Sequence, residues 1–255
     1  MFIDLNCDMG ESYGAGRTGN DDELMPLVTS ANIACGYHGG DPGTMHHAVR
    51  LAQAYGVAIG AHPAYPDLQG FGRRPMQLSA QEVYDIVLYQ LGALEAYTRA
   101  GGGKLNHVKP HGALYNQASA NEELASAIAT AVYYFDRTLF LFGPPGSELE
   151  KSANRLGIPF CAEAFADRSY QPDGSLTPRS MPNALIRDTV QCLQQVWQIL
   201  EKGTVTATDG SVIPMKAGTI CIHGDGLHAT EFARAIRQSL TEKGVRLQAP
   251  RSVHA

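Results

Sequence analysis

The sequence of 255 residues has no long apolar run and no basic leader. No stretch approaches the roughly 18 consecutive apolar residues of a membrane-spanning helix, so we expect no membrane span and no membrane partner. The chain starts with Met1 and reaches the acidic residues Asp4 and Asp8 without the basic segment that opens a signal peptide. We therefore expect a cytoplasmic protein without a leader.

Paired cysteines and an excess of positive charge are also absent. The five cysteines are odd in number and include no CxxC pair, which argues against a disulfide scaffold and against a zinc finger. Cys35, Cys161 and Cys221 lie in apolar runs, so we expect them to be small buried side chains in a reducing cytosol. With 20 Lys and Arg against 25 Asp and Glu, the net charge of −5 disfavours nucleic-acid binding.

Three motifs of nucleotide and acyl chemistry are missing as well. The sequence contains no GxxxxGK[ST] phosphate loop, and its glycine run at 101–103 precedes a predicted strand rather than a helix. No GxGxxG follows the first apolar run, and no GxSxG occurs. We therefore expect no nucleotide binding by this chain alone and no serine nucleophile.

Short apolar runs alternate with segments of helical periodicity along the whole chain. Seven runs have strand character: 2–7, 31–35, 57–61, 104–108, 138–142, 159–162 and 219–222. Because polar turns and helix-like segments separate them, the pattern predicts an α/β fold with a parallel sheet and right-handed crossovers. Seven units fit an eight-fold-like barrel with one unit missing, or else an open doubly wound sheet, in a single domain over 1–255.

Capping signals predict where several helices begin and end. Asp41 and Pro42 open a helix that Gly56 closes, and the capping box at 79–82 opens a helix that stops at the glycine run 101–103. Amphipathic helices are expected over 187–202 and 227–243, with other helix starts at Asn121, Pro145 and Asp225. The segments 164–185 and 204–216 are predicted to be loops, the second with a hairpin around 209–210.

Ionisable side chains gather just after the predicted strands. In parallel α/β folds the carboxyl ends of the strands meet on one side and form the active site. Six of the seven predicted strand ends carry such residues, among them Asp8, Glu11, His38, His62, Lys109, His111, Glu163, Asp167, Arg168 and His223. This placement predicts one concave polar site at the mouth of the fold.

Several of these residues have a simpler interpretation. Asp41 is expected only to cap its helix, and Asp225 either caps a helix or belongs to the site. His107 lies inside a predicted strand, where a structural role is expected. Arg168 either binds an anion or forms a salt bridge with its neighbour Asp167, and the glycine amides after His38 offer an anion cradle at a helix N-terminus.

A metal site is a further alternative. Asp8, His38, His62, His111 and His223 could supply two or three ligands and leave an open coordination position, as in metal-assisted hydrolysis. The sequence has no HExxH or similarly spaced pair, and Lys109 beside these residues would repel a cation. We therefore assign no metal ligand from the sequence, although a divalent cation is compatible with it.

Six segments together resemble the LamB/YcsF family. They are DLNCDMGE at 4–11, ANIACGYHGGDP at 31–42, GAHP at 60–63, GFGR at 70–73, VKPHGALY at 108–115, and EAFADR at 163–168 followed by Tyr170. The resemblance implies a (β/α)7 barrel of the glycoside hydrolase/deacetylase type. It also implies ATP-dependent ring opening of 5-oxo-L-proline (pyroglutamate) to L-glutamate by a 5-oxoprolinase, in which this chain works with partner subunits B and C.

The implied reaction assigns roles to nine residues. Because this chain has no nucleotide motif, phosphorylation by ATP falls to the partners, and this chain would hydrolyse the activated lactam. The catalytic candidates are Asp8 and Glu163 as base, His62 and His111 as acid or oxyanion donor, and Lys109 as a cation for anionic groups. The substrate-binding candidates are Glu11, His38, Arg168 and His223.

Two other functions remain open at the level of sequence. One is a metal-dependent amidase or carbohydrate deacetylase that acts alone, and the other is a non-catalytic subunit that binds substrate or organises its partners.

Overall fold

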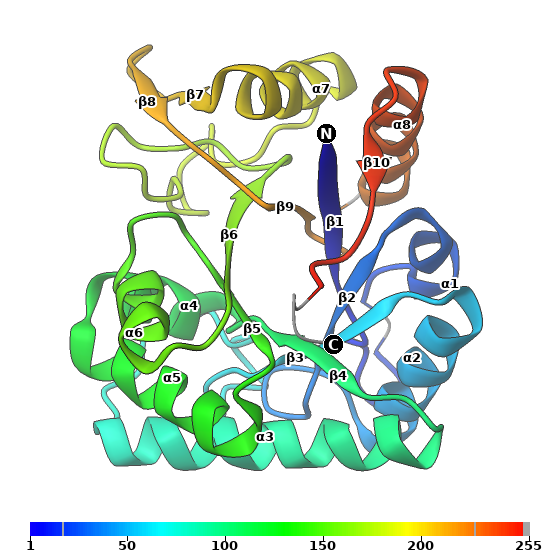
Figure 1. Cartoon of the computed structure of the whole chain (residues 1–255), viewed down its shortest axis with the longest axis vertical. Coiled ribbons are helices and arrows are strands. Elements are labelled where there is room, and N and C mark those ends of the chain that lie inside the picture. Colours follow the sequence, from blue (N-terminus) through cyan, green and yellow to red (C-terminus); the bar gives the residue numbers. More distant parts are fainter. Residues whose placement is uncertain (17, 227, 252–255) are drawn as a thin grey trace.

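The chain folds into a closed barrel of parallel strands, as the computed structural model shows for residues 1–16, 18–226 and 228–251 (Figure 1). Seven strands form the barrel: β1 (Phe2–Met9), β2 (Ser30–Ala34), β3 (Ala58–His62), β4 (Leu105–Val108), β5 (Phe140–Gly143), β6 (Phe160–Phe165) and β9 (Thr219–Ile222). They pair in that order, and β9 pairs with β1 to close the ring. All seven predicted strands are therefore confirmed, and the open doubly wound sheet is wrong.

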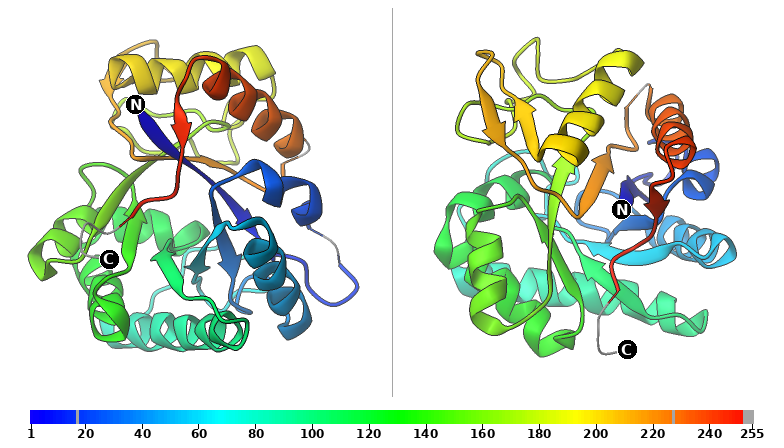
Figure 2. Two further views of the ribbon diagram at one scale, coloured as in Figure 1. Left: turned by 45° about the vertical axis from the view of Figure 1, so that its right-hand side comes forward. Right: turned by 45° about the horizontal axis from the view of Figure 1, so that its top comes forward.

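Helices surround the barrel (Figures 1 and 2). They are α1 (Asp21–Leu24), η1 (Met25–Leu27), α2 (Pro42–Tyr55), α3 (Ala80–Ala100), α4 (Gly112–Ala120), α5 (Glu122–Asp136), α6 (Glu148–Leu156), α7 (Thr189–Trp197), η2 (Gln198–Lys202) and α8 (Ala229–Glu242). None of the helices in the described part of the chain is both long and apolar enough to cross a membrane.

The predicted caps account for both ends of α2 and for the start of α3. The Asp41 carboxylate accepts the Thr44 N–H at the start of α2, and Gly56 ends that helix in the left-handed region. Ser79 and Glu82 form the predicted capping box at α3. Asp225 does not cap α8, because that helix begins four residues later at Ala229 and the Asp225 side chain pairs with Arg73.

Two elements lie outside the regular barrel pattern. The strands β7 (Thr204–Thr206) and β8 (Val212–Pro214) form the predicted antiparallel hairpin, which lies beside η2 and the long segment 166–188 (Figure 2). The short strand β10 (Arg246–Leu247), which the sequence analysis did not predict, pairs with the start of β1. After β10, the carbonyl oxygen of Pro250 accepts a hydrogen bond from Asn106 at β4.

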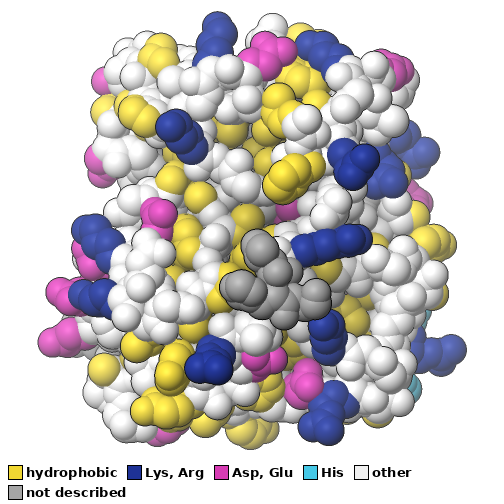
Figure 3. All heavy atoms as spheres, in the orientation of Figure 1, with side chains coloured by type: hydrophobic (Ala, Val, Ile, Leu, Met, Phe, Trp, Pro, Cys, Tyr) yellow, Lys and Arg dark blue, Asp and Glu magenta, His cyan; other side chains and the backbone are white. Residues whose placement is uncertain are grey.

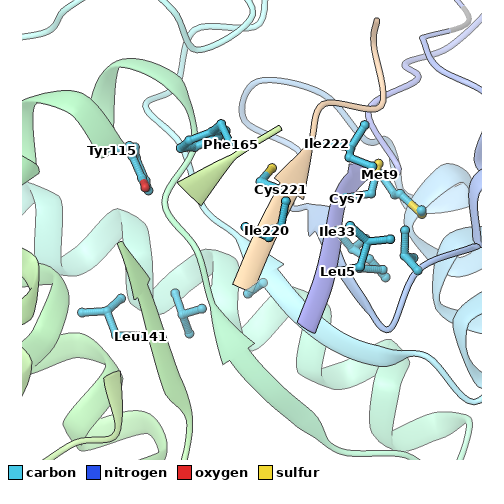
Figure 4. Close-up of a cluster of buried hydrophobic side chains, with 14 of the residues drawn as sticks. Leu5, Cys7, Met9, Ile33, Tyr115, Leu141, Phe165, Ile220, Cys221 and Ile222 are labelled. Carbon is cyan, nitrogen blue, oxygen red and sulfur yellow. The ribbon is translucent and has the colours of Figure 1, made fainter. Parts of the chain in front are cut away.

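The strand β1 shows how the barrel interior differs from its outer surface. Its residues Leu5, Cys7 and Met9 belong to the apolar cluster that packs with Ile33 and Ile222, as Figure 4 shows. The alternating residues Asp4, Asn6 and Asp8 are also buried, and their hydrogen-bond partners lie on β2, β6 and β9. Because side chains alternate along a strand, one face of β1 builds the apolar layer beneath the helices and the other a polar barrel interior.

The outer surface is mixed in character. On the face shown in Figure 3, Lys and Arg side chains are interspersed with Asp and Glu and with scattered hydrophobic groups.

Candidate active site

A cavity of about 820 Å³ opens where the barrel strands end. Its walls come from strand ends of the barrel, from α4, from the segment 168–179 and from β8. The ionisable and aromatic residues that line it are Asp8, His62, Arg73, Lys109, His111, Tyr115, Glu163, Phe165, Arg168, Tyr170, Asp173, Arg179 and His223. The predicted concave polar site therefore exists at the predicted end of the strands.

Lys109 is the centre of the buried charges at the base of this cavity. Its Nζ lies 2.7 Å from Asp8 Oδ1, 3.0 Å from Glu163 Oε1 and 2.9 Å from Cys221 Sγ. Burial disfavours the ammonium charge, but Asp8, Cys221 and Glu163 outweigh it and hold the pKa of Lys109 well above its usual value. The lysine is therefore a permanent cation between two carboxylates.

Asp8 is held in place from three directions. Its Oδ1 accepts a 2.8 Å hydrogen bond from Asn32 Nδ2 in addition to the one from Lys109, and its Oδ2 lies 3.5 Å from His62 Nε2. Burial raises its pKa, but His62 and Lys109 outweigh burial, so the pKa of Asp8 lies well below its usual value. Asp8 is thus a fixed carboxylate.

Beneath Asp8, a network of neutral side chains sets the orientation of the charged groups. Asn6 Nδ2 donates to Glu163 Oε1 at 3.1 Å, and Asn32 Nδ2 donates to Asn6 Oδ1 at 2.7 Å. His107 Nε2 lies 2.7 Å from Asn32 Oδ1, and burial, followed by Lys109, lowers the pKa of His107 to about 3. Neutral His107 therefore donates from Nε2 to Asn32 Oδ1 and fixes the orientation of the Asn32 amide. This contact agrees with the structural role expected for His107 from the sequence.

Two buried polar atoms in the cavity wall have no hydrogen-bond partner among the described residues. They are Glu163 Oε2 and the Tyr115 hydroxyl oxygen. Burial, followed by the charge of Glu163, raises the pKa of Tyr115 well above its usual value, so the phenol stays protonated. An interaction between the phenol and the Glu163 carboxylate also contributes to this pKa, so the two atoms lie near each other, and because buried polar groups are normally satisfied we regard them together as a candidate contact for a bound molecule.

His223 faces the cavity as the outer member of a carboxylate–imidazole pair. Its Nδ1 lies 3.0 Å from Asp167 Oδ1, and its ring stacks on Phe165 with centroids 5.2 Å apart. Burial raises the pKa of Asp167, but the interaction with His223 outweighs burial and lowers it. The contact orients the imidazole with Nδ1–H toward Asp167 and leaves Nε2 as the atom that meets the cavity.

Three guanidinium groups lie along one side of the cavity. Arg168 donates from Nη2 to Thr177 O at 2.6 Å and from Nε to Ala184 O at 3.2 Å. Burial, followed by the neighbouring Arg179, lowers the pKa of Arg168 to about 10. Arg73 Nη2 pairs with Asp225 at 2.5 Å, and Arg179 Nη1 lies 3.9 Å from the same carboxylate. Of the two alternatives left open for Arg168, the salt bridge with Asp167 does not form, because Asp167 is engaged by His223.

Four residues at and behind the cavity wall bring ligating atoms together. Glu11, His38, His62 and His111 each place one nitrogen or oxygen within 4.8 Å of the others, and all four side chains are buried. We call them the histidine cluster. One carboxylate and three imidazoles are donors that suit a divalent cation, so the cluster could hold one.

Of the nine residues assigned from the sequence, seven line the cavity, and Glu11 and His38 lie behind it in the histidine cluster. Glu163 lies within β6 rather than after it, and its side chain reaches the cavity from inside the barrel. In the glycine anion cradle predicted after His38, the Gly40 N–H already donates to Ser12 O, and a Cβ on Gly39 would lie 2.6 Å from Glu11 O. These glycines allow two chain segments to approach closely.

The sequence analysis missed several residues of the site. Asn6, Asn32, Tyr115, Arg179 and Cys221 were assigned no role, yet they contact or neighbour the charged centre. One signal was available for Asn6, because polar residues at every second position of an otherwise apolar strand indicate a polar barrel interior. Figure 4 shows how Tyr115, Phe165 and Cys221 come from three separate elements.

Known proteins similar to this chain agree with this architecture. The profile of the LamB/YcsF family matches residues 3–255. A relative from Brevibacillus brevis, named as the A subunit of 5-oxoprolinase, is 53% identical over 247 residues, which are 97% of this chain and 97% of the relative. The crystal structure of a lactam utilization protein from Thermus thermophilus is 50% identical and superimposes with a TM-score of 0.92, covering 98% of this chain and 100% of that one.

More distant structures share only the fold. A family 4 carbohydrate esterase from Streptomyces lividans superimposes with a TM-score of 0.53 at 14% identity, covering 96% of this chain and 91% of that one. The expected barrel of the glycoside hydrolase/deacetylase type is therefore confirmed.

Proposed function

Because this chain belongs to the LamB/YcsF family, we propose that it is the A subunit of a 5-oxoprolinase and takes part in opening the lactam ring of 5-oxo-L-proline to L-glutamate. The proposal includes consumption of ATP by the complex, partner subunits B and C, and a cytoplasmic location. The relatives' names support the reaction, and the cavity supports a hydrolytic role for this chain.

A lactam requires activation before water can attack it. The five-membered amide is a weak electrophile, and phosphorylation of its carbonyl oxygen makes the ring carbon more reactive. We assign phosphorylation to the partner subunits, because the chain contains no phosphate-loop motif. This chain then adds water to the activated carbon, the C–N bond breaks as the nitrogen takes a proton, and a second water releases phosphate from the acyl phosphate.

The observation that carries the proposal is the pair of carboxylates around Lys109, one locked and one partly free. Asp8 Oδ1 accepts hydrogen bonds from Asn32 and Lys109, and Asp8 Oδ2 lies 3.5 Å from His62 Nε2, whereas Glu163 Oε2 has no hydrogen-bond partner among the described residues. We therefore assign the base to Glu163, and to Asp8 the task of holding Lys109. Lys109 stabilises negative charge on the phosphate and on the oxygen that water adds to the ring carbon.

Proton delivery to the leaving nitrogen is assigned to His223. The free nitrogens of His62 and His111 face each other at 2.9 Å, whereas His223 presents Nε2 to the cavity and is oriented by Asp167. This assignment revises the substrate-binding role proposed for His223 from the sequence. Tyr115 and Arg179 are added as substrate contacts, the arginine for the carboxylate or phosphate of the activated lactam.

Glutamate release from 5-oxo-L-proline and ATP, with both partner subunits present, tests the proposal. Glu163→Gln keeps the side-chain shape but removes the base, so we expect a loss of about 10²- to 10⁴-fold in kcat. Glu201→Gln is the matched control, because Glu201 lies on η2 and, within the described part of the chain, its one salt bridge is with Lys243 at 3.6 Å. Full activity of Glu163→Gln would refute its role as base.

The same assay separates the proposal from the alternatives. Activity only in the complete mixture supports the assignment of this chain to a multi-subunit complex. Ring opening by this chain alone without ATP would instead support an amidase that acts independently. An active complex that contains Glu163→Gln, Lys109→Met and His223→Asn together would favour a non-catalytic role.

A further inference from the structure

We propose that Glu11, His38, His62 and His111 form a binding site for one divalent transition-metal ion. Glu11 follows β1, His38 follows β2, His62 ends β3, and His111 is the N-cap residue of α4. Because β1, β2 and β3 are neighbours in the barrel, the fold itself brings these residues together. Their relative exposures are 4%, 1%, 1% and 4%. This inference does not depend on the proposed function, because it rests on the hydrogen-bond geometry of the cluster alone.

The tautomers of His62 and His111 leave two lone pairs facing each other. His62 Nδ1 lies 2.7 Å from the carbonyl oxygen of Lys109, so Nδ1 must carry the proton. His111 Nε2 lies 2.9 Å from the carbonyl oxygen of Phe71, so this nitrogen also carries its proton. His62 Nε2 and His111 Nδ1 are then both bare in the neutral rings, yet they lie 2.9 Å apart. A cation between or beside them satisfies both.

Glu11 points its carboxylate at the same place. Its Oε1 lies 2.9 Å from His38 Nε2 and 3.5 Å from His111 Nδ1. Among the described residues, Glu11 forms no salt bridge with a lysine or an arginine, so imidazoles are the partners of this buried carboxylate. Buried charges are normally paired or bind a metal, and a metal ion supplies the missing positive charge.

The spacing of the four atoms suits tetrahedral coordination. Metal–nitrogen distances of about 2.0–2.1 Å place neighbouring tetrahedral ligands roughly 3.3 Å apart. The three contacts given above are 2.9, 2.9 and 3.5 Å, and all four ligating atoms lie within 4.8 Å of one another. Small side-chain shifts therefore complete the coordination without a change of the backbone.

The neighbouring contacts have the form that metal-bound histidines usually show. A ligating imidazole normally donates its other N–H to a carbonyl or carboxylate, which fixes the ring, and His62 and His111 both do so to backbone carbonyls. The repulsion expected from Lys109 is offset, because its ammonium group lies against Asp8 and Glu163. Three imidazoles and one carboxylate favour Zn²⁺, Co²⁺, Ni²⁺ or Fe²⁺ over Mg²⁺ and Ca²⁺.

The test measures metal content and metal-induced stabilisation of the full chain. We expect the protein purified without chelator to contain about one equivalent of a transition metal by mass spectrometry. We also expect the chelator-treated protein to gain thermal stability when Zn²⁺ or Co²⁺ is added, but not when Mg²⁺ is added. Co²⁺ should in addition give the visible absorption of a tetrahedral site.

Variants locate the metal. Loss of a residue that only orients a metal ligand lowers metal affinity by up to about 100-fold. Because His38 and His111 are ligands themselves in this proposal, His38→Gln and His111→Gln should each weaken Zn²⁺ binding by at least that factor. His223→Gln is the matched control, because this cavity histidine lies outside the cluster, and it should bind metal as the unaltered protein does. Far-ultraviolet circular dichroism checks that each variant is folded.

Two results would overturn the inference. One is a chelator-treated, folded protein that takes up none of Zn²⁺, Co²⁺, Ni²⁺ or Fe²⁺ at micromolar concentration, which would mean that a shared proton joins His62 and His111. The other is undiminished Zn²⁺ binding by both cluster variants, which would place the metal elsewhere.

Discussion

Replacing Lys109 by methionine should destabilise the protein strongly, because it removes the only cation that contacts Asp8 and Glu163 together in the described structure. Methionine preserves most of the length and apolar stem of the side chain, so little packing is lost. The two carboxylates are 4% and 1% exposed and would be left without their shared partner. Breaking a buried ion pair in this way costs about 3–5 kcal/mol.

Guanidinium unfolding followed by circular dichroism at pH 7 measures this loss. Lys109→Met should lower the free energy of unfolding by about 3–5 kcal/mol, whereas Lys151→Met, which removes an exposed pair with Glu148, should change it by less than about 0.5 kcal/mol. The double variant Lys109→Met/Glu163→Gln removes one of the uncompensated charges and should recover about 1–3 kcal/mol. A Lys109→Met loss below about 1 kcal/mol, or purely additive effects in the double variant, would refute the electrostatic reasoning.

Three further changes test other parts of the structure. Burial, opposed by hydrogen bonds from Thr219, Thr29 and Ser30, raises the pKa of Asp4 from 3.8 to about 6. The folded chain therefore binds the proton more tightly, and the stability gained from it below about pH 4 should be lost, by about 3 kcal/mol, as the pH rises through 6. Asp4→Asn should lack this fall in unfolding curves between pH 4 and 8, and an unchanged pH profile would contradict the assignment. Gly60→Ala should destabilise by about 1–3 kcal/mol in thermal melts, because a Cβ there would collide with the His107 ring, and wild-type stability would show that the ring moves freely. Ser79→Ala should cost about 1 kcal/mol by removing the capping box of α3, whereas an equal loss in exposed Ser175→Ala would point to a non-specific effect.

Strand positions were predictable because the barrel strands are buried on both faces. The run at 219–222 coincides with β9, and the other six runs match their strands to within a few residues. A continuous apolar run bounded by turn residues is typical of such strands. The helix caps were predictable because Asp41 and Ser79 each accept a hydrogen bond from a backbone N–H three residues later, and Asp41 keeps this cap although its other oxygen accepts from the distant Gly14 N–H.

The errors lie where a distant segment competes for a side chain. Arg168 was weighed as a partner of Asp167, but His223 from the end of β9 takes that carboxylate, and Arg168 turns to the carbonyls of Thr177 and Ala184. Asp225 was weighed as a cap for α8 and instead meets Arg73, which lies 152 residues earlier in the chain. Sequence spacing contains no information on such competitors.

The order of strands and helices, the end of the barrel that holds the chemistry and the set of ionisable residues there could all be read from the chain itself. These features depend on periodicity and on the direction of parallel strands, which are local properties of the sequence. Closure of the barrel decided the rest. Pairing of β9 with β1 brings Asp8 on β1, Glu163 on β6 and Lys109 just after β4 into contact, and it places Asp8 next to His62 of the histidine cluster. Which carboxylate stays free, and which imidazole nitrogens face each other, follows from distances that exist only after the ring has closed.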